Sequence, residues 1–231
     1  MKFREDYKII FPMNPDIVVI PECENIDRID LGSFSDKVTD SYWIGDNDSK
    51  GLGVFTFNGF KIELYDDYDD QYKYILPLII SRDNESYNVI GCWTKITDDY
   101  EYIGQLQYSL KHYDSFLNNE NVIICGDLNR NQYWEKMGGH DLNHQEVVDK
   151  LSKKGIHSSY HNFFNEEQGK ETTPTFYLYH KEDRPFHIDY CFLSKSLIDR
   201  LKKVEIGKYN DWMKFSDHVP LIIDINTSNC P

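Results

Sequence analysis

Residues 122–129 read Val-Ile-Ile-Cys-Gly-Asp-Leu-Asn, a short apolar run followed by a glycine, a carboxylate and an amide. The run is short and rich in β-branched residues, which predicts a buried strand rather than a helix. Asp127 and Asn129 come directly after its apolar part, where the chain reaches the edge of the predicted sheet. Taken alone, the two residues also suit a turn or a helix cap, so their chemical role depends on what the rest of the chain supplies.

Three other apolar segments carry polar residues that packing does not require. They are 15–22 (PDIVVIPE), which ends in Glu22; 187–190 (HIDY), which contains Asp189; and 216–223 (SDHVPLII), which contains Asp217 and His218. Carboxylate oxygens are the ligands that Mg²⁺ prefers, and a histidine beside an aspartate suits acid–base work or contact with phosphate. An amide next to a carboxylate can position a water molecule. The set therefore indicates metal-assisted hydrolysis of a phosphate ester.

The other apolar runs alternate along the chain with amphipathic segments. We expect strands at 16–20, 52–57, 74–80, 87–93, 121–125, 174–179, 187–193 and 219–225, and helices at 3–11, 101–117 and 143–154. Strands interleaved with helices are typical of a layered α/β domain. The acidic segment 66–70 lacks the ligand spacing of a calcium loop, and we interpret it as a solvated turn between two strands.

Length and charge limit the classes of protein to consider. The 231 residues suit one domain, 1–231, and contain no apolar run of the roughly 20 residues that a membrane span needs. Because the N-terminus has no signal-peptide apolar region, we expect a cytoplasmic protein. The net charge of −14 argues against a protein that holds polyanions tightly by itself. Carboxylates that hold a metal ion nonetheless form a phosphate-binding surface.

The segments PDIVVIPE, GLGVF, VIICGDLN, TPTF, HIDYCFL and SDHVPLII follow one another as the motifs of the endonuclease/exonuclease/phosphatase superfamily do. The chain resembles this superfamily, which includes DNase I-like nucleases, abasic-site endonucleases, inositol-phosphate phosphatases and neutral sphingomyelinases, over nearly its whole length. The resemblance implies an α/β fold, a four-layer sandwich of two packed mixed β-sheets flanked by helices. It also implies a Mg²⁺ or Mn²⁺ cofactor and hydrolysis of nucleic acid by an activated water.

The resemblance assigns four catalytic roles. Asp127 resembles the residue that orients or deprotonates the attacking water, and Asn129 the amide that helps to hold the water and the phosphate. His218 resembles the histidine that contacts the scissile phosphate or acts as acid or base. Asp189 is similar to an aspartate of the same site and is expected to orient His218.

The resemblance also implies two metal ligands. The sequence departs from the family pattern at three points. Glu22 resembles the principal metal-ligand glutamate, and Asp217 a carboxylate of the metal site or a partner of His218. The family opens with a strand ending in an asparagine, and we expect both to be missing here. Pro21 stands where a glutamine often precedes the glutamate, and Trp93 where many members place a histidine.

Four further residues are candidates for substrate binding, each with a structural alternative. They are Trp93, which could stack on a base or belong to the core; Arg130, which could contact a flanking phosphate or be solvated; Thr175 of TPTF; and His187, which could touch phosphate or simply pack.

Two other functions stay open at this point. The same chemistry could act on inositol phosphates or phospholipid headgroups, although the lysines and arginines do not cluster as such substrates would require. A catalytically silent binding protein on the same fold is the other alternative. No membrane and no obligatory protein partner is expected.

Overall fold

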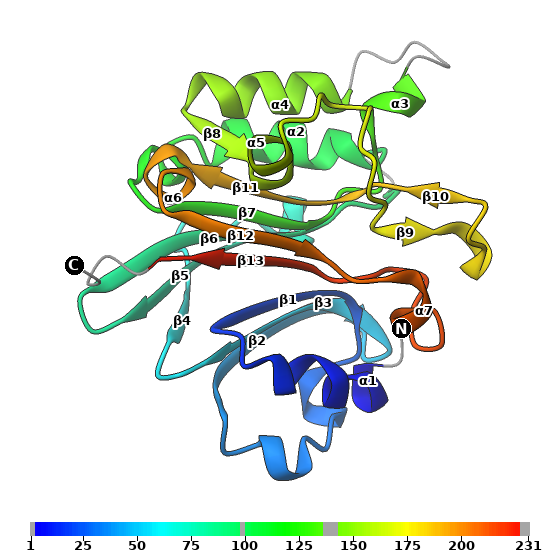
Figure 1. Ribbon diagram of the computed structural model, residues 1–231. Helices are drawn as coiled ribbons and strands as arrows, with labels where there is room; N and C mark the ends of the chain where they lie inside the picture. The colour runs from blue at the N-terminus through cyan, green and yellow to red at the C-terminus, as the bar shows by residue number, and fades with distance from the viewer. Residues whose placement is uncertain (1–2, 98–99, 136–142, 227–231) are drawn as a thin grey trace.

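The computed structural model describes residues 3–97, 100–135 and 143–226 (Figure 1). The strands are β1 (Ile17–Cys23), β2 (Val38–Asn47), β3 (Lys50–Phe57), β4 (Lys61–Leu64), β5 (Ile75–Arg82), β6 (Glu85–Trp93), β7 (Val122–Asp127), β8 (Ile156–Ser158), β9 (Phe176–Tyr177), β10 (Pro185–Phe186), β11 (Asp189–Ser194), β12 (Leu201–Ile206) and β13 (Leu221–Ile225). The α-helices are α1 (Phe3–Ile10), α2 (Ile103–His112), α3 (Gln132–Glu135), α4 (His144–Lys153), α5 (Ser159–Phe164), α6 (Lys195–Ile198) and α7 (Tyr209–Trp212).

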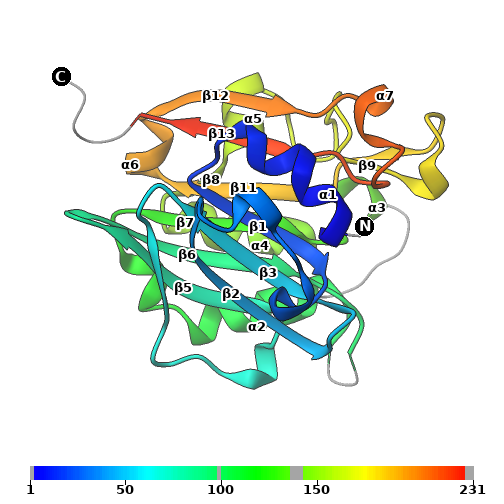
Figure 2. The same cartoon turned by 90° about the horizontal axis from the view of Figure 1, so that it is seen from below.

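Two layers of sheet form the centre of the molecule. The larger sheet has the order β4-β5-β6-β7-β11-β8; β6 and β7 are parallel, and the other neighbours are antiparallel. The antiparallel sheets β1-β3-β2 and β12-β13 lie together against one face of it, with β1 contacting β6 and β7, and β13 contacting β11 (Figures 1 and 2). The small pair β9-β10 projects at the side.

Helices cover the outer faces of both layers. Apolar side chains of α2 and α4 pack against the large sheet, a second cluster lies between the two layers of sheet, and α1 covers the outer face of β1-β3-β2. Representative residues are Leu106, Leu151 and Ile124 for the first cluster, Val54, Leu78 and Val89 for the second, and Tyr7, Phe11 and Phe55 for the third. This order of helix, sheet, sheet, helix is the predicted four-layer α/β sandwich, which the structure confirms.

The second layer is split between β1 and β13. Both views place these strands side by side, yet over the described residues β1 pairs with β3 alone and β13 with β12 alone (Figures 1 and 2). Apolar residues on both strands, such as Val18 and Ile222, are half-buried.

Most predicted elements are confirmed, but the helix expected at 101–117 ends at His112, and one predicted strand is much shorter. The strand expected at 174–179 shrinks to Phe176–Tyr177, because Tyr179 and His180 adopt left-handed backbone conformations (φ 59° and 56°) that end it. The long strand β2 was not predicted at all. The acidic segment 66–70 does lie in the turn between β4 and β5. Among the helices that the structure describes, none is long and apolar enough to cross a membrane.

Candidate active site

Three neighbouring strands of the large sheet carry candidate residues at the same edge. In the ladder, Trp93 at the end of β6 pairs with Asp127 at the end of β7, and Asp127 pairs with Asp189 at the start of β11. Residues directly opposite each other in a sheet project to the same face, so the side chains of Asp127 and Asp189 are neighbours. Two carboxylates distant in sequence are thereby brought together at the ends of two inner strands of the sheet.

Gly126 allows the chain to reach this arrangement. Its φ of +140° is a conformation that residues with a side chain rarely adopt. A Cβ atom at this position would lie 1.9 Å from the carbonyl oxygen of Cys92 on β6. The glycine in the sequence GDLN therefore permits close pairing of β6 and β7 immediately before the carboxylate.

Asp127 and Asn129 form one hydrogen-bonded unit. The backbone N–H of Asn129 donates to Oδ1 of Asp127 (2.8 Å), and its side-chain amide donates to Oδ2 (2.8 Å) and to the carbonyl oxygen of Thr94 (2.8 Å). Asn129 has a φ of 46°, a left-handed conformation that these bonds hold in place. Thr94, which the sequence did not single out, also donates its N–H to the carbonyl oxygen of Asp127 (3.0 Å). Both oxygens of the carboxylate are thus fixed.

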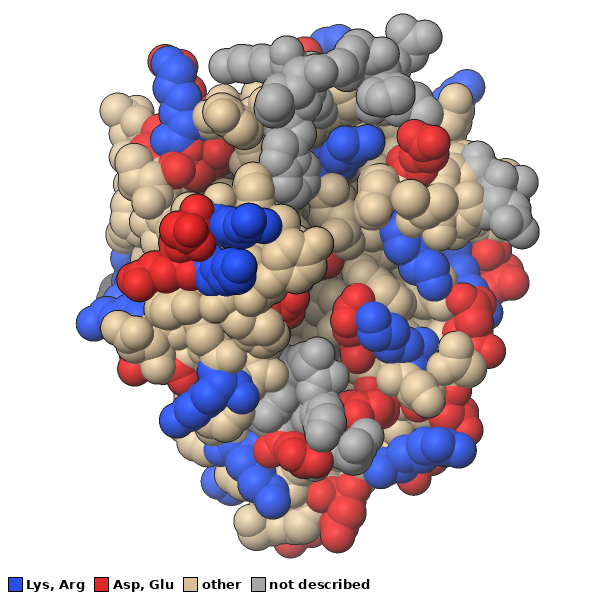
Figure 3. Space-filling model, turned by 90° about the vertical axis from the view of Figure 1, so that its right-hand side faces the viewer, with Lys and Arg blue, Asp and Glu red and all other residues tan. Residues whose placement is uncertain are grey.

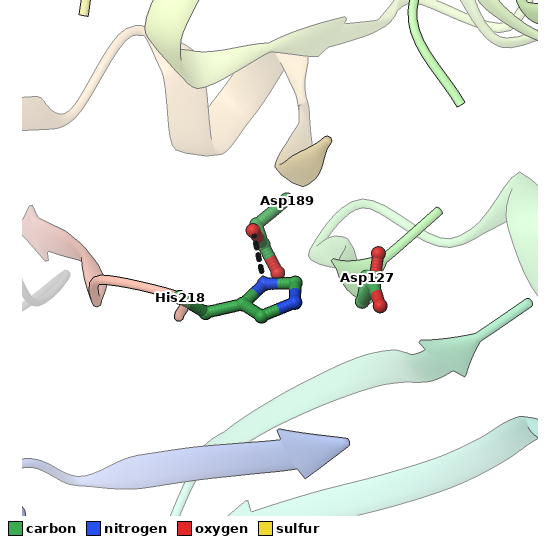
Figure 4. A group of neighbouring side chains, drawn as sticks. All are labelled: Asp127, Asp189 and His218. Carbon is green, nitrogen blue, oxygen red and sulfur yellow. Dashed lines mark hydrogen bonds and ion pairs between the residues drawn. The ribbon is translucent and has the colours of Figure 1, made fainter. Parts of the chain in front are cut away.

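His218 enters the site from the segment before β13. Its Nδ1 donates to Oδ2 of Asp189 (2.9 Å), the residue expected to orient it, and the Asp127 carboxylate lies beside the same ring (Figure 4). One ligand atom from each of Asp127, Asp189 and His218 lies within 4.8 Å of the others. The ring of Phe176 packs against His218, with centroids 4.7 Å apart. The site therefore joins the large sheet to β13.

The electrostatics of the three residues are linked. Burial, followed by the negative charge of Asp189, raises the pKa of Asp127 to about 7. Burial on its own would lower the pKa of His218, but the Asp189 carboxylate, together with the charges of Asp127 and Asp217, outweighs it and raises the pKa to about 10. His218 is therefore held as a cation at neutral pH, and the carboxylates repel each other.

This group suits a divalent cation. The carboxylate oxygens of Asp127 and Asp189 lie within reach of one another, and a positive ion near them would relieve the repulsion that raises the pKa of Asp127. The face that carries these strand ends is hollowed near its middle, where acidic side chains show, with Lys and Arg nearby on the surrounding surface (Figure 3). The carboxylate oxygens at this edge of the sheet therefore suit a divalent cation.

The two predicted metal ligands lie beside this group. Glu22 sits at a bulge of β1 with a φ of 60°, and its charge contributes to the raised pKa of Asp127. Its carboxylate pairs with the Lys50 ammonium (2.8 Å), a neighbour that no sequence signal indicated. Asp217 acts on His218 through its charge, while the carboxylates drawn together are those of Asp127 and Asp189. Metal binding by Glu22 and Asp217 stays a prediction.

Two expected substrate contacts need correction, because the structure buries both side chains. Thr175 is fully buried, and its hydroxyl oxygen accepts hydrogen bonds from the backbone N–H groups of Ile188 (3.1 Å) and Asp189 (3.0 Å). His187 is 4% exposed, and its Nδ1 donates to the carbonyl oxygen of Thr173 (2.8 Å). Neither side chain faces solvent, so both support the strand that carries Asp189.

The other two candidates for substrate contact, Trp93 and Arg130, have different surroundings. Trp93 is only 6% exposed, packs edge-to-face on Tyr74 (centroids 5.0 Å apart) and is covered by Lys95, so core packing accounts for it. The half-buried Arg130 lies over the ring of Tyr102, 5.3 Å from its centroid, rather than free in solvent. Contact between Arg130 and a flanking phosphate stays a prediction.

Replacing Thr175 with valine is expected to destabilise the protein by about 2–4 kcal/mol, because two buried N–H groups lose their acceptor. Serine keeps the oxygen and loses only a methyl group, so Thr175→Ser should cost about 1 kcal/mol. Urea unfolding of the two variants measures the difference. Equal losses would show that the hydroxyl acceptor is not the main contribution of this side chain to stability.

Comparison with known proteins was made by sequence and by structure. No family model and no curated protein matches the sequence. An AP endonuclease from Archaeoglobus fulgidus superposes with a TM-score of 0.71 at 18% identity, covering 98% of this chain and 96% of that one. The chain has the DNase I-like fold.

Two further solved structures with the DNase I-like fold agree. A 3′ phosphatase from Neisseria, bound to a product DNA hairpin, gives a TM-score of 0.69 at 15% identity. A 3′–5′ exonuclease from Neisseria meningitidis gives 0.68 at 14%. Each alignment covers 98% of this chain and 96% of the other. The fold expected from the motifs is confirmed, and the chemistry must be argued from the site.

Proposed function

We propose that this protein is a divalent-metal-dependent phosphodiesterase that hydrolyses nucleic acid. We also propose that it consists of a single domain and acts in the cytoplasm. The observation that carries the proposal is the group of Asp127, Asp189 and His218, with Asn129 bound to both oxygens of Asp127 through its two N–H donors. The similar solved structures include an AP endonuclease and an exonuclease, which supports nucleic acid as the substrate class.

Each residue of the site has its own role in the proposed reaction. Asp127 accepts the proton of the attacking water, whose oxygen forms a bond to phosphorus as the ester P–O bond breaks. The Asn129 amide fixes the orientation of Asp127, and protonated His218, held by Asp189, stabilises the negative charge that grows on the phosphoryl oxygens. Glu22 and Asp217 are the proposed ligands of the metal. When bound, the metal polarises the phosphoryl oxygen and favours ionisation of water.

A cleavage assay with labelled DNA, RNA, abasic DNA and inositol phosphates tests the proposal. We expect one of the nucleic acids to be cut, the activity to disappear in EDTA, and excess Mg²⁺ or Mn²⁺ to restore it, because the carboxylates of the site need a cation to approach phosphate. Cleavage of inositol phosphates alone would instead identify a phosphatase of small phosphoesters. Absence of cleavage in every condition would favour a silent binding protein.

A further inference from the structure

A buried polar network lies directly behind the Asp127–Asn129 turn. Its centre is Asn131, which is 4% exposed and follows Asn129 by two residues. The side-chain amide of Asn131 donates to the carbonyl oxygen of His187 (2.8 Å), the hydroxyl oxygen of Tyr190 (3.1 Å) and Oε2 of Glu171 (3.1 Å). His187 and Tyr190 flank Asp189 in sequence. Asn131 therefore links the turn that carries one catalytic carboxylate to the strand that carries the other.

The carbonyl oxygen of the same amide has a separate task. It accepts a hydrogen bond from the backbone N–H of Tyr133 (2.6 Å), at the first turn of α3. One side of the Asn131 side chain must therefore accept and the other must donate. Among residues of the same shape, asparagine meets this requirement and aspartate does not.

Glu171 gives the network a fixed negative charge. Its Oε1 accepts hydrogen bonds from Nε2 of His161 (3.0 Å) and from the backbone N–H of Gly169 (2.9 Å). Burial would raise the pKa of Glu171, but the hydrogen bonds from His161, Gly169 and Asn131 outweigh it and hold the pKa at about 2. The carboxylate is thus ionised at neutral pH and anchors the Asn131 amide.

The turn is also joined to the neighbouring strand by the β7–β11 ladder, which ends at the pair of Asp127 and Asp189. Beyond Asn131, the backbone N–H of Leu128 donates to the carbonyl oxygen of Ile188 (2.9 Å). Asn129 stands in a left-handed conformation, which persists only where the surroundings hold it. A small movement of the turn would displace the carboxylate of Asp127 from the attacking water.

We propose that Asn131 is a positioning residue that holds the Asp127–Asn129 turn against the Asp189 strand, with Glu171 as its anchor. The role rests on the proposed function. It predicts that loss of the Asn131 amide impairs the chemical step and leaves substrate and metal binding intact, because Asn131 is buried and touches neither.

Asn131→Asp tests the role with almost no change of volume. The new carboxylate would face the Glu171 carboxylate and the His187 carbonyl oxygen, so three acceptors would meet with only the Tyr190 hydroxyl as a donor between them. We expect kcat to fall by about 10- to 100-fold, since misplacement of a reacting group by about 1 Å has effects of this size. KM and the affinity for Mn²⁺, measured by titration calorimetry, should stay within about twofold of wild type if binding is untouched.

Rescue separates positioning from simple damage. Glu171→Gln in the Asn131→Asp background removes one of the two facing charges and supplies an amide donor in its place. The double variant should recover about tenfold of the lost kcat, as expected for residues coupled in one network. Failure of the second substitution to restore any activity would contradict the anchoring role of Glu171.

Asn88→Asp is the matched control. Asn88 is also a buried amide (8% exposed) that donates to a carbonyl oxygen, that of Phe116 (2.7 Å), but it pairs with Val122 at the other end of β7 from Asp127. Both Asp variants should lose stability, and only the one at Asn131 should lose kcat. Equal kcat in the two, with wild type active, would overturn the positioning role alone. An inactive wild type would overturn the proposed function and, with it, this role.

Discussion

Asp127→Asn is expected to lower kcat by about a thousandfold or more while the protein stays folded, because general-base catalysis contributes factors of about 100 to 10,000. The asparagine has the same shape and still accepts the hydrogen bond from the Asn129 backbone, but it loses the one from the Asn129 side-chain amide and cannot take a proton from water. Single-turnover cleavage with saturating Mn²⁺ measures the loss. Asp199→Asn, at an exposed carboxylate paired with Lys195 (2.7 Å), is the matched control and should keep full activity.

The pH dependence of the activity gives a second test of Asp127 as the base. Because burial and the charge of Asp189 raise the pKa of Asp127 to about 7, the base is protonated and inactive in acid and becomes active as pH rises. A bound cation favours the ionised carboxylate, so this limb of the profile should move to lower pH at high metal concentration. The sign for stability is opposite: a folded-state pKa above the unfolded value means that ionisation destabilises the fold. Above pH 7 the Asn variant should therefore escape the cost of the buried charge, and its loss of stability should be limited to the missing hydrogen bond from the Asn129 side-chain amide. A variant that kept more than about a tenth of the activity would exclude Asp127 as the base.

Gly126→Ala is expected to destabilise the protein by more than about 4 kcal/mol, enough to prevent folding of a marginally stable domain. The added Cβ would lie 1.9 Å from the carbonyl oxygen of Cys92, and the positive φ adds strain. A backbone oxygen inside a paired strand has no room to move, so β6 and β7 would have to separate. Circular dichroism and urea unfolding of the purified variant measure the effect.

Gly155→Ala provides the comparison for this substitution. Gly155 also has a positive φ (+71°), but nothing lies within 4 Å of a Cβ built there. Its replacement should cost about 1–2 kcal/mol from backbone strain alone. If the two alanine variants lost the same stability, the close approach of β6 and β7 would not be the reason for the glycine in GDLN.

The sequence predicted those residues of the site that directly adjoin apolar strands. Glu22, Asp127 and His218 each adjoin a run of β-branched residues, and a strand that ends in a carboxylate is visible without a structure. The side-by-side position of Asp127 and Asp189 was not visible, because it depends on the register between β7 and β11. Register is set by packing of both faces of the sheet, which a single strand does not encode.

Other features were missed for a common reason. The polar and half-buried strand β2 lacks the apolar run that marks the others. Lys50 and Glu171 come from loops or strand ends, and their partners are decided by how distant segments meet in space. Thr175 was expected near the substrate because its motif, TPTF, was expected near the site. The direction of its side chain, into the protein, follows from hydrogen bonds with two backbone N–H groups of a segment more than ten residues away.

The split in the second layer gives the active site two parts of unequal resistance to local opening. Asp127 and Asp189 lie on strands that are paired on both sides, so their backbone amides should exchange with solvent only when much of the domain unfolds. Glu22 and His218 adjoin β1 and β13, each of which has a ladder on one side over the described residues. These strands can fray at a small free-energy cost while the six-stranded sheet stays intact. A ligand that bridges the two parts should therefore slow exchange along β1 and β13 far more than along β7 and β11, because it holds the strands that have a ladder on one side only.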